Sequence, residues 1–357
     1  MKTELPRKSL ILRLTAIGAV LASIFGIFAY TGGWLTPRAL TPSSLIDTFQ
    51  EVNGPHPGFR RNHAKGVCIR GTFESNGRGA TLSKAQVFAP GTVPVIGRFA
   101  LAGGQPYATD APHTVRSMAL LFHLPNGEEW RTGNNNMPVF PVKSAQAFHD
   151  LLTASAADPT TGKPNPAKMS AFFAAYPESA KAMALIRDTP VSSGFENSTF
   201  NSLNAFLLTN AEGATVPVRW SWIPLQPFAP ISTTEPGLAD KNYLFDALIA
   251  AIHAGPQRWK LVVTIGRPDD PTSDPTLAWP PERPQIEVGT LTIDQIESED
   301  VSPARDINFD PLILPTGIAG SDDPLLSVRS ATYSQSFTRR EGEPKTPSAV
   351  SAAETAK

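Results

Sequence analysis

Three segments of the chain, far apart in sequence, carry side chains that are able to move protons or bind a metal. Residues 60–66 read RRNHAKG and include His63, whose imidazole can accept and return a proton near neutral pH. Residues 133–140 read GNNNMPVF and offer amides that can donate hydrogen bonds to developing negative charge. Arg329 and Tyr333 are four residues apart, on one face of a helix, where a guanidinium can favour a phenolate that binds ferric iron.

Each segment also has an ordinary structural explanation. A lone histidine is by default a hydrogen-bonded structural residue, three asparagines are typical of a turn, and an Arg-x-x-x-Tyr pair is usually a solvated helical pair. The other histidines are too scattered for a recognisable metal motif. The sequence has neither a Gly-x-Ser-x-Gly elbow nor a P-loop. The chemical interpretation therefore depends on finding all three segments in one chain.

In this order, the three segments resemble the site motifs of haem catalases. Two further stretches, at 259–261 and 279–291, are similar to parts of that family's barrel. The resemblance extends from about Gly54 to Arg340. Because the chain is much shorter than typical catalases and ends soon after the tyrosine, it is most similar to the small catalase-related peroxidases.

The resemblance implies a haem of the b type (heme b) and a role for nine residues. Tyr333 would be the axial iron ligand, and Arg329 would stabilise its phenolate. His63 would be the distal acid–base, and Asn135 would orient the peroxide; family spacing selects Asn135, although its two asparagine neighbours stay alternatives. Phe140 and Phe148 would contact the cofactor through their aromatic rings. Three arginines would bind its propionates, with an ordinary exposed surface position as the alternative: Arg60, Arg98 and Arg340.

Four positions depart from the family pattern, and they concern access to the site more than the iron. Asn62 stands where catalases usually carry a valine that narrows the channel, and Ser117 stands where a channel aspartate is usual. Ala100 replaces the serine that normally holds the distal histidine, so His63 is expected to be less tightly oriented. Pro141 replaces a phenylalanine. These changes indicate a channel that admits bulkier peroxides or organic electron donors.

The resulting hypothesis is a haem peroxidase that reduces organic peroxides and hydrogen peroxide through a ferryl intermediate, using an unidentified electron donor. The alternative is a true catalase that disproportionates hydrogen peroxide. Three other functions stay open. An enzyme that rearranges fatty-acid hydroperoxides would need no electron donor. A haem carrier or sensor would bind haem that does not react with peroxide, and a scaffold would bind no haem.

The N-terminus is expected to be a membrane anchor. The stretch Leu14 to Leu35 is uncharged and mostly apolar, long enough to cross a bilayer, and it follows the basic residues 2, 7, 8 and 13. This predicts a single-pass protein of the inner (cytoplasmic) membrane with an extracytoplasmic, periplasmic domain. A cleaved signal peptide and a buried core helix are the alternatives. Residues 36–41 read as a short stalk.

Composition narrows the class of protein further. Among 357 residues, 35 prolines and 26 glycines favour a β-rich body with long ordered loops, and 41% hydrophobic residues support a substantial core. The net charge of −1 provides no field that attracts nucleic acid. The single cysteine, Cys68, excludes an internal disulfide and any multi-cysteine metal site.

The pattern of elements favours an α+β fold. Strands are expected in the first half of the chain, at 65–75, 93–101, 117–124 and 137–142. Further strands are expected later in the chain, with helices between and after them. The resemblance adds an antiparallel β-barrel with helices packed outside. We expect a membrane anchor and stalk at 1–38, a catalase-like haem domain at 39–341 and a disordered tail at 342–357.

Overall fold

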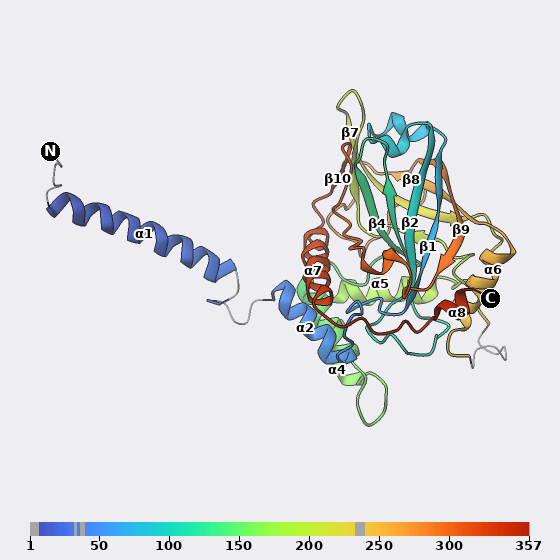
Figure 1. Ribbon diagram of the computed structural model, residues 1–357, viewed down its shortest axis with the longest axis horizontal. Helices are drawn as coiled ribbons and strands as arrows, with labels where there is room; N and C mark the ends of the chain where they lie inside the picture. The colour runs from blue at the N-terminus through green and yellow to red at the C-terminus, as the bar shows by residue number, and fades with distance from the viewer. Residues whose placement is uncertain (1–6, 32–33, 36–39, 233–239, 357) are drawn as a thin grey trace.

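An antiparallel sheet closes on itself at the centre of this computed structural model, which describes residues 7–31, 34–35, 40–232 and 240–356 (Figure 1). The strands are β1 (Gly66–Ser75), β2 (Gly91–Leu101), β3 (Arg116–His123), β4 (Glu129–Asn135), β5 (Phe200–Asn201), β6 (Phe206–Thr209), β7 (Thr215–Pro224), β8 (Gln257–Ile265), β9 (Gln285–Glu297) and β10 (Ile318–Gly320). The ring runs β7-β5-β4-β3-β2-β1-β9-β8 and returns to β7, while β6 and β10 extend it at one side. The expected barrel is confirmed.

Aromatic side chains fill the inside of the barrel. Phe122 stacks on Trp130 with ring centroids 4.8 Å apart, and Phe73 meets Phe122 edge-on at 5.6 Å. Trp222 and Trp259 are also fully buried there. Such rings pack without leaving room for a ligand. A site must therefore lie on the outer face of the strands.

The alternation of side chains along β2, β3 and β4 sets up that outer face. On β2, Val95 and Phe99 point into the barrel core, so the alternate residues Arg98 and Ala100 point outward. The strand register then aligns two outward rows, one of Arg98, Ala119 and Gly133 and one of Ala100, Ser117 and Asn135. One of the three predicted segments, 133–140, thus places Gly133 and Asn135 in these outward rows.

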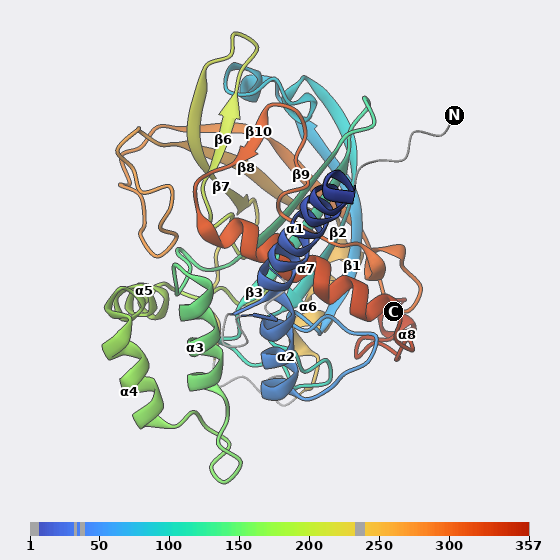
Figure 2. The same ribbon diagram turned by 90° about the vertical axis from the view of Figure 1, so that its left-hand side faces the viewer.

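Helices cover this outer face (Figure 2). The cover consists of α2 (Pro42–Asn53), α3 (Ala145–Ser155) and α7 (Pro324–Glu341), each begun by a side-chain cap from Thr41, Ser144 and Asp323, respectively. The other helices are α1 (Arg7–Thr31), α4 (Pro166–Ala175), α5 (Pro177–Asp188), α6 (Tyr243–Ala254) and α8 (Ala352–Thr355), with 3-10 turns η1 (Arg78–Thr81), η2 (Gln86–Phe88) and η4 (Pro303–Asp306).

The apolar contacts of α2 and α3 are separate from the barrel core, to which α7 contributes Leu326. Leu45, Ile46 and Phe49 of α2 form a small cluster with Phe148 of α3 and Val328 of α7. The barrel core is a much larger cluster that extends from the strands into α6. The helices of the cover therefore share few apolar contacts with the barrel core.

The C-terminal segment differs from the prediction of a disordered tail. Val350 is fully buried, and its carbonyl accepts a hydrogen bond of 2.7 Å from Ser298 Oγ. Glu354 Oε1 accepts one of 3.0 Å from the amide of Asn242. Composition alone suggested disorder because the segment is rich in Pro, Ser, Ala and Thr, but these few contacts attach it to the domain.

A second difference concerns the stretch 137–142, which is a loop and not the expected short buried strand. Its apolar side chains are buried as predicted for a strand, with Val139 and Val142 fully enclosed. Pro138 and Pro141 lack the N–H groups that a sheet ladder needs, which accounts for the irregular backbone.

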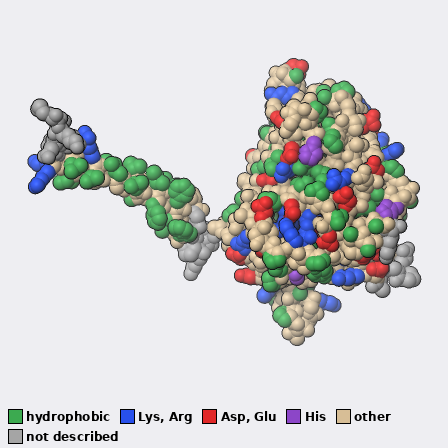
Figure 3. Space-filling model, in the orientation of Figure 1, with side chains coloured by type: hydrophobic (Ala, Val, Ile, Leu, Met, Phe, Trp, Pro, Cys, Tyr) green, Lys and Arg blue, Asp and Glu red, His purple; other side chains and the backbone are tan. Residues whose placement is uncertain are grey.

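The helix α1 is the one candidate membrane span among the described residues. It has 25 residues and a mean hydropathy of 2.2 over its most apolar window, and at about 1.5 Å per residue it is longer than a bilayer core of about 30 Å. Its exposed apolar side chains stand apart from the domain (Figure 3). A signal sequence has the same properties, so the helix alone does not decide between anchor and signal. Most of the expected stalk, at 36–39, lies outside the described residues.

Candidate active site

A cavity lies between the outward rows of β2–β4 and the helices α2, α3 and α7, with about 1200 Å³ of empty space when its solvent-open mouth is included. All nine residues to which the sequence assigned a role line it: Arg60, His63, Arg98, Asn135, Phe140, Phe148, Arg329, Tyr333 and Arg340. Residues separated by almost the whole domain in sequence therefore share one site.

His63 is held in an unusual backbone conformation. Its φ of 57° lies in the left-handed region, which costs a non-glycine residue of order 1–3 kcal/mol and is concentrated at functional sites. The side chain of Asn62 supports this turn, because its Oδ1 accepts hydrogen bonds from the N–H of His63 at 3.0 Å and of Gly103 at 2.9 Å. Asn62 thus shapes the loop as well as lining the cavity.

The imidazole of His63 is neutral in this environment. Burial lowers its pKa to about 3, and the guanidinium groups of Arg98, Arg329 and Arg60 act in the same direction. A neutral imidazole carries one N–H and one free lone pair. His63 is therefore ready to accept a proton at ordinary pH.

Ser117 connects His63 to Asn135. Its Oγ lies 3.0 Å from Nδ1 of His63 and donates a short hydrogen bond to Oδ1 of Asn135. The expectation that Ala100 leaves His63 loosely oriented is therefore wrong. The hydroxyl comes from Ser117, which lies directly opposite Ala100 in the register of β2 and β3. Sequence spacing cannot show such a pairing.

Tyr333 of α7 faces the neighbouring outward row, that of Arg98, Ala119 and Gly133. A Cβ built at Gly133 would lie 3.6 Å from the Tyr333 hydroxyl, so the phenol reaches the outer face of β4. The guanidinium carbon of Arg329 lies 6.0 Å from the centre of the Tyr333 ring. In the described part of the chain no hydrogen bond joins these two side chains. Arg329 instead donates a short hydrogen bond to Oδ1 of Asn204.

Asn204 explains the position of Arg329. Its Nδ2 donates to Oδ2 of Asp323 at 2.7 Å, which leaves Oδ1 turned towards the guanidinium. Asp323 also caps the start of α7, the helix that carries Arg329. The sequence interpretation missed Asn204, which no local pattern connects to the helix.

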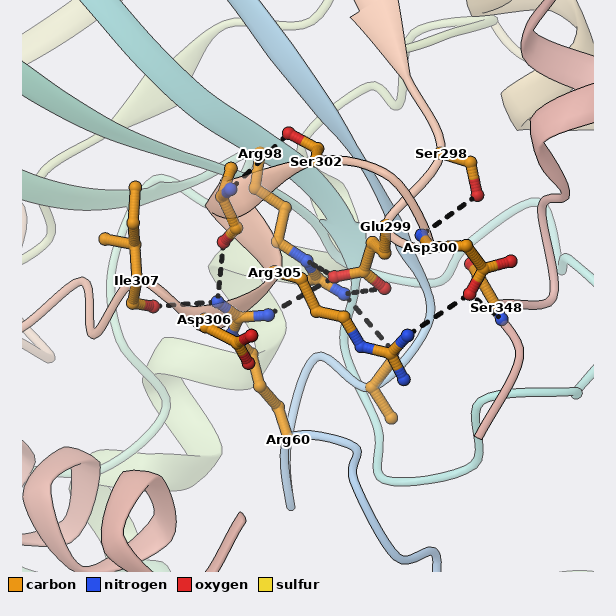
Figure 4. Close-up of polar contacts among 12 residues, drawn as sticks. Arg60, Arg98, Ser298, Glu299, Asp300, Ser302, Arg305, Asp306, Ile307 and Ser348 are labelled. Atoms are coloured by element: carbon orange, nitrogen blue, oxygen red, sulfur yellow. Dashed lines mark hydrogen bonds and ion pairs between the residues drawn. The ribbon is translucent and has the colours of Figure 1, made fainter. Parts of the chain in front are cut away.

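Arg60 and Arg98 meet at a buried carboxylate, that of Glu299 (Figure 4), and Arg340 lines the same cavity. Glu299, whose side chain is 4% exposed, accepts hydrogen bonds from Arg98 Nε at 2.6 Å, Arg98 Nη2 at 3.2 Å and Arg60 Nη1 at 3.3 Å. Burial, followed by the charges of Arg340 and Arg98, lowers the pKa of Arg60 well below its usual value, and Glu299 opposes this. Burial lowers the pKa of Arg340 to about 10. Asp306 and Glu299 are the carboxylates that oppose the lowered pKa of Arg340, so three arginines share two anions in an environment suited to further carboxylates.

The residues present fit an iron porphyrin with two carboxylates. Arg340 Nε is buried without a hydrogen-bond partner and lines the cavity, as expected of a group that receives an anion. Phe140 and Phe148, with ring centroids 5.9 Å apart, belong to its walls, which are mainly apolar. The phenol of Tyr333 is a suitable ligand for ferric iron. Among the described residues there is no cluster of three His, Cys, Asp or Glu side chains for a metal.

The family model described as catalase matches residues 31–349, and the chain belongs to the catalase family. It is 35% identical to the catalase-related peroxidase of Synechococcus elongatus over 329 residues, which are 91% of this chain and 95% of that protein. It is 32% identical to the catalase-related peroxidase of Mycolicibacterium paratuberculosis, covering 85% and 96% of the two chains. The family consists of oxidoreductases that act on peroxide, and this chain is an enzyme of that class.

Longer catalases are also similar. The catalase of Pseudomonas syringae pv. syringae is 28% identical over 87% of this chain and 63% of its own length. A solved bacterial catalase superposes with a TM-score of 0.70 at 24% identity, covering 85% of this chain and 62% of that structure. That likeness supports the fold. The small catalase-related peroxidases match this chain over nearly their full length.

Proposed function

We propose that the protein is a haem-dependent peroxidase with His63 as distal acid–base, Asn135 as orienting amide and Tyr333 as axial ligand. The observation that carries the proposal is the arrangement of one cavity, with His63 and Asn135 joined through Ser117, the phenol on the opposite helix and three arginines at one end. Arg60, Arg98 and Arg340 would hold the propionates, Phe140 and Phe148 would contact the ring, and Arg329 would favour the charged form of the phenol.

A bound haem would supply the redox chemistry, through which the peroxide receives two electrons that the donor then replaces. The chain itself handles the proton. His63 would take the proton from one peroxide oxygen at Nε2, the nitrogen not engaged by Ser117, and return it to the other oxygen as the O–O bond breaks. Asn135 would donate from Nδ2 to the oxygen on which negative charge develops. The overall reaction is ROOH + 2 e⁻ + 2 H⁺ → ROH + H₂O.

The access route supports organic peroxides alongside hydrogen peroxide as substrates. The small side chains of Ala100 and Ser117 line the cavity together with apolar residues of α2. We propose that an external electron donor completes the cycle; its identity is left open. True catalase activity is the alternative, favoured by similarity to catalases of several bacteria. Oxygen release without added donor would favour the catalase reaction, and donor-dependent peroxide loss would favour the peroxidase.

We further propose that α1 anchors the enzyme as a single-pass protein of the cytoplasmic (inner) membrane, with the haem domain on the extracytoplasmic, periplasmic side. The apolar length of α1 and the basic residues at its start support this placement. Protease added to intact spheroplasts should degrade the domain; a protected domain, or a mature chain that begins after residue 31, would contradict the anchor in this orientation.

The visible absorption spectrum of the full-length protein, purified in detergent with haem supplied, tests the function. A ferric tyrosinate spectrum that changes promptly with peroxide is expected. Tyr333→Phe should bind haem far more weakly, and His63→Ala should keep haem while slowing the first reaction with peroxide by about 10²–10⁴-fold. A spectrum indifferent to peroxide would indicate a carrier, and a colourless protein a scaffold.

A further inference from the structure

Among the described residues, the hydroxyl of Ser117 is the one group that contacts both His63 and Asn135 at hydrogen-bond distance. A hydroxyl has one hydrogen to donate and can accept others. Oδ1 of Asn135 is only an acceptor, so the hydrogen of Ser117 points to Asn135. Ser117 Oγ is then left to accept from Nδ1 of His63, which favours the tautomer with the single imidazole proton on Nδ1. The backbone carbonyl of Leu101 is a second acceptor near the ring, and it competes for the same proton.

We infer that Ser117 is a positioning residue that fixes the tautomer of His63 and the orientation of the Asn135 amide in one step. The first bond leaves a lone pair on Nε2, which can receive a proton. The second leaves both N–H groups of the Asn135 amide available to an oxygen in the cavity. The inference rests on the proposed function for its catalytic meaning, whereas the tautomer itself is a property of the protein without haem.

The strand register explains why Ser117 can serve both partners. Ser117 is the central member of the outward row and lies directly opposite both Ala100 and Asn135. Opposite side chains in an antiparallel pair lie about 4.5–5.5 Å apart at Cβ, close enough for a short side chain to reach a neighbour. Ala100 leaves space beside Ser117, and the loop with its left-handed His63 brings the imidazole to the same place.

The tautomer can be measured directly by ¹⁵N NMR on full-length protein labelled at histidine, in detergent and without haem. His63→Gln identifies the His63 signals. The wild type should show protonated Nδ1 and unprotonated Nε2, and Ser117→Ala should show a mixture of tautomers or the opposite one. Ser117→Thr, which keeps the hydroxyl, should restore the wild-type pattern. An unprotonated Nδ1 in the wild type, or an unchanged tautomer in Ser117→Ala, would overturn the inference.

Ser221→Ala is a matched control. Ser221 donates to Oδ1 of Asn201 at 2.6 Å on the far side of the same strand row, without a contact to His63, so its loss should leave the tautomer unchanged. Thermal unfolding identifies a variant that fails to fold, in which case Ser117→Cys, with a weaker donor of similar size, replaces Ser117→Ala under the same expectations.

In the haem-loaded enzyme, Ser117→Ala should lower kcat about tenfold with little change in KM, the loss expected for one hydrogen bond that orients a catalytic group. Ser117→Thr should recover most of it. If the protein binds no haem, the proposed function fails while the NMR result still stands. If haem binds and peroxide reacts but neither tautomer nor kcat responds, the role of Ser117 fails alone.

Discussion

Replacement of Glu299 by glutamine should destabilise the domain strongly. The substitution keeps the shape of the side chain but removes the negative charge and sets an amino group against the donors of Arg98 or Arg60. Both partners are largely buried, with side chains 3% exposed at Arg98 and 4% at Glu299. Breaking a buried pair in this way costs about 3–5 kcal/mol, because a buried charge is left uncompensated.

Differential scanning calorimetry of the haem-free protein measures this cost. At about 2 °C per kcal/mol for a domain of this size, Glu299→Gln should lower Tm by roughly 6–10 °C. Glu297→Gln is the matched control, two residues earlier at the end of β9. Its ion pair with Arg70 is partly exposed, at 31% and 39%, so the expected loss is below about 1 kcal/mol.

Haem provides a second test of the same reasoning. If its carboxylates enter the arginine cluster, they replace part of the missing charge, and haem should raise Tm more in Glu299→Gln than in the wild type. Equal, small shifts of Tm in Glu299→Gln and Glu297→Gln would refute the view that Glu299 neutralises buried arginines. A large shift that haem does not reduce would place the propionates elsewhere.

Three further predictions follow from the geometry. Asn62→Ala should cost about 2 kcal/mol in urea unfolding, since two backbone N–H groups lose their acceptor, and Asn62→Asp should keep most of that stability. The folded pKa of His63, about 3, lies below its unfolded value near 6.5, so its contribution to stability is complete above pH 6.5 and is lost as pH falls towards 3. Between pH 6.5 and 4.5 the wild type should lose about 2–3 kcal/mol more than His63→Gln, and equal losses would contradict the lowered pKa. Val350→Asp should destabilise the domain by at least about 3 kcal/mol, whereas Val301→Asp, at a side chain 66% exposed, should not; equal melting temperatures would mean that the C-terminal segment does not pack in solution.

The sequence predicted most of the elements because their boundaries carry local signals. Ser144 and the run of spaced apolar residues after it indicate a helix, which the structure begins at Ala145. The strand at 93–101 is apolar enough to be recognised without its neighbours. By contrast β4 was not expected, since its run of Asn and Gly has low strand propensity and becomes a strand by pairing with β3.

The candidate residues were found through motifs, and the contacts between them were not. His63, Asn135 and Tyr333 lie in one cavity as the resemblance implied, while their roles stay predictions. The position of Ser117 depends on cross-strand register, and the pairing of Glu299 with arginines about 200 residues earlier depends on the closed barrel. Neither relationship leaves a pattern in the chain itself.

The barrel is able to fold before the cavity is filled, because its apolar core runs through the strands and α6 without including α2 or α3. The small cluster beneath α2 can open without exposing that core, and such local opening costs only part of the free energy of global unfolding. A large prosthetic group can therefore enter late in maturation through movement of the cover. The same opening would be the route of its loss, so the residence time of the cofactor depends on how firmly α2 and α7 close.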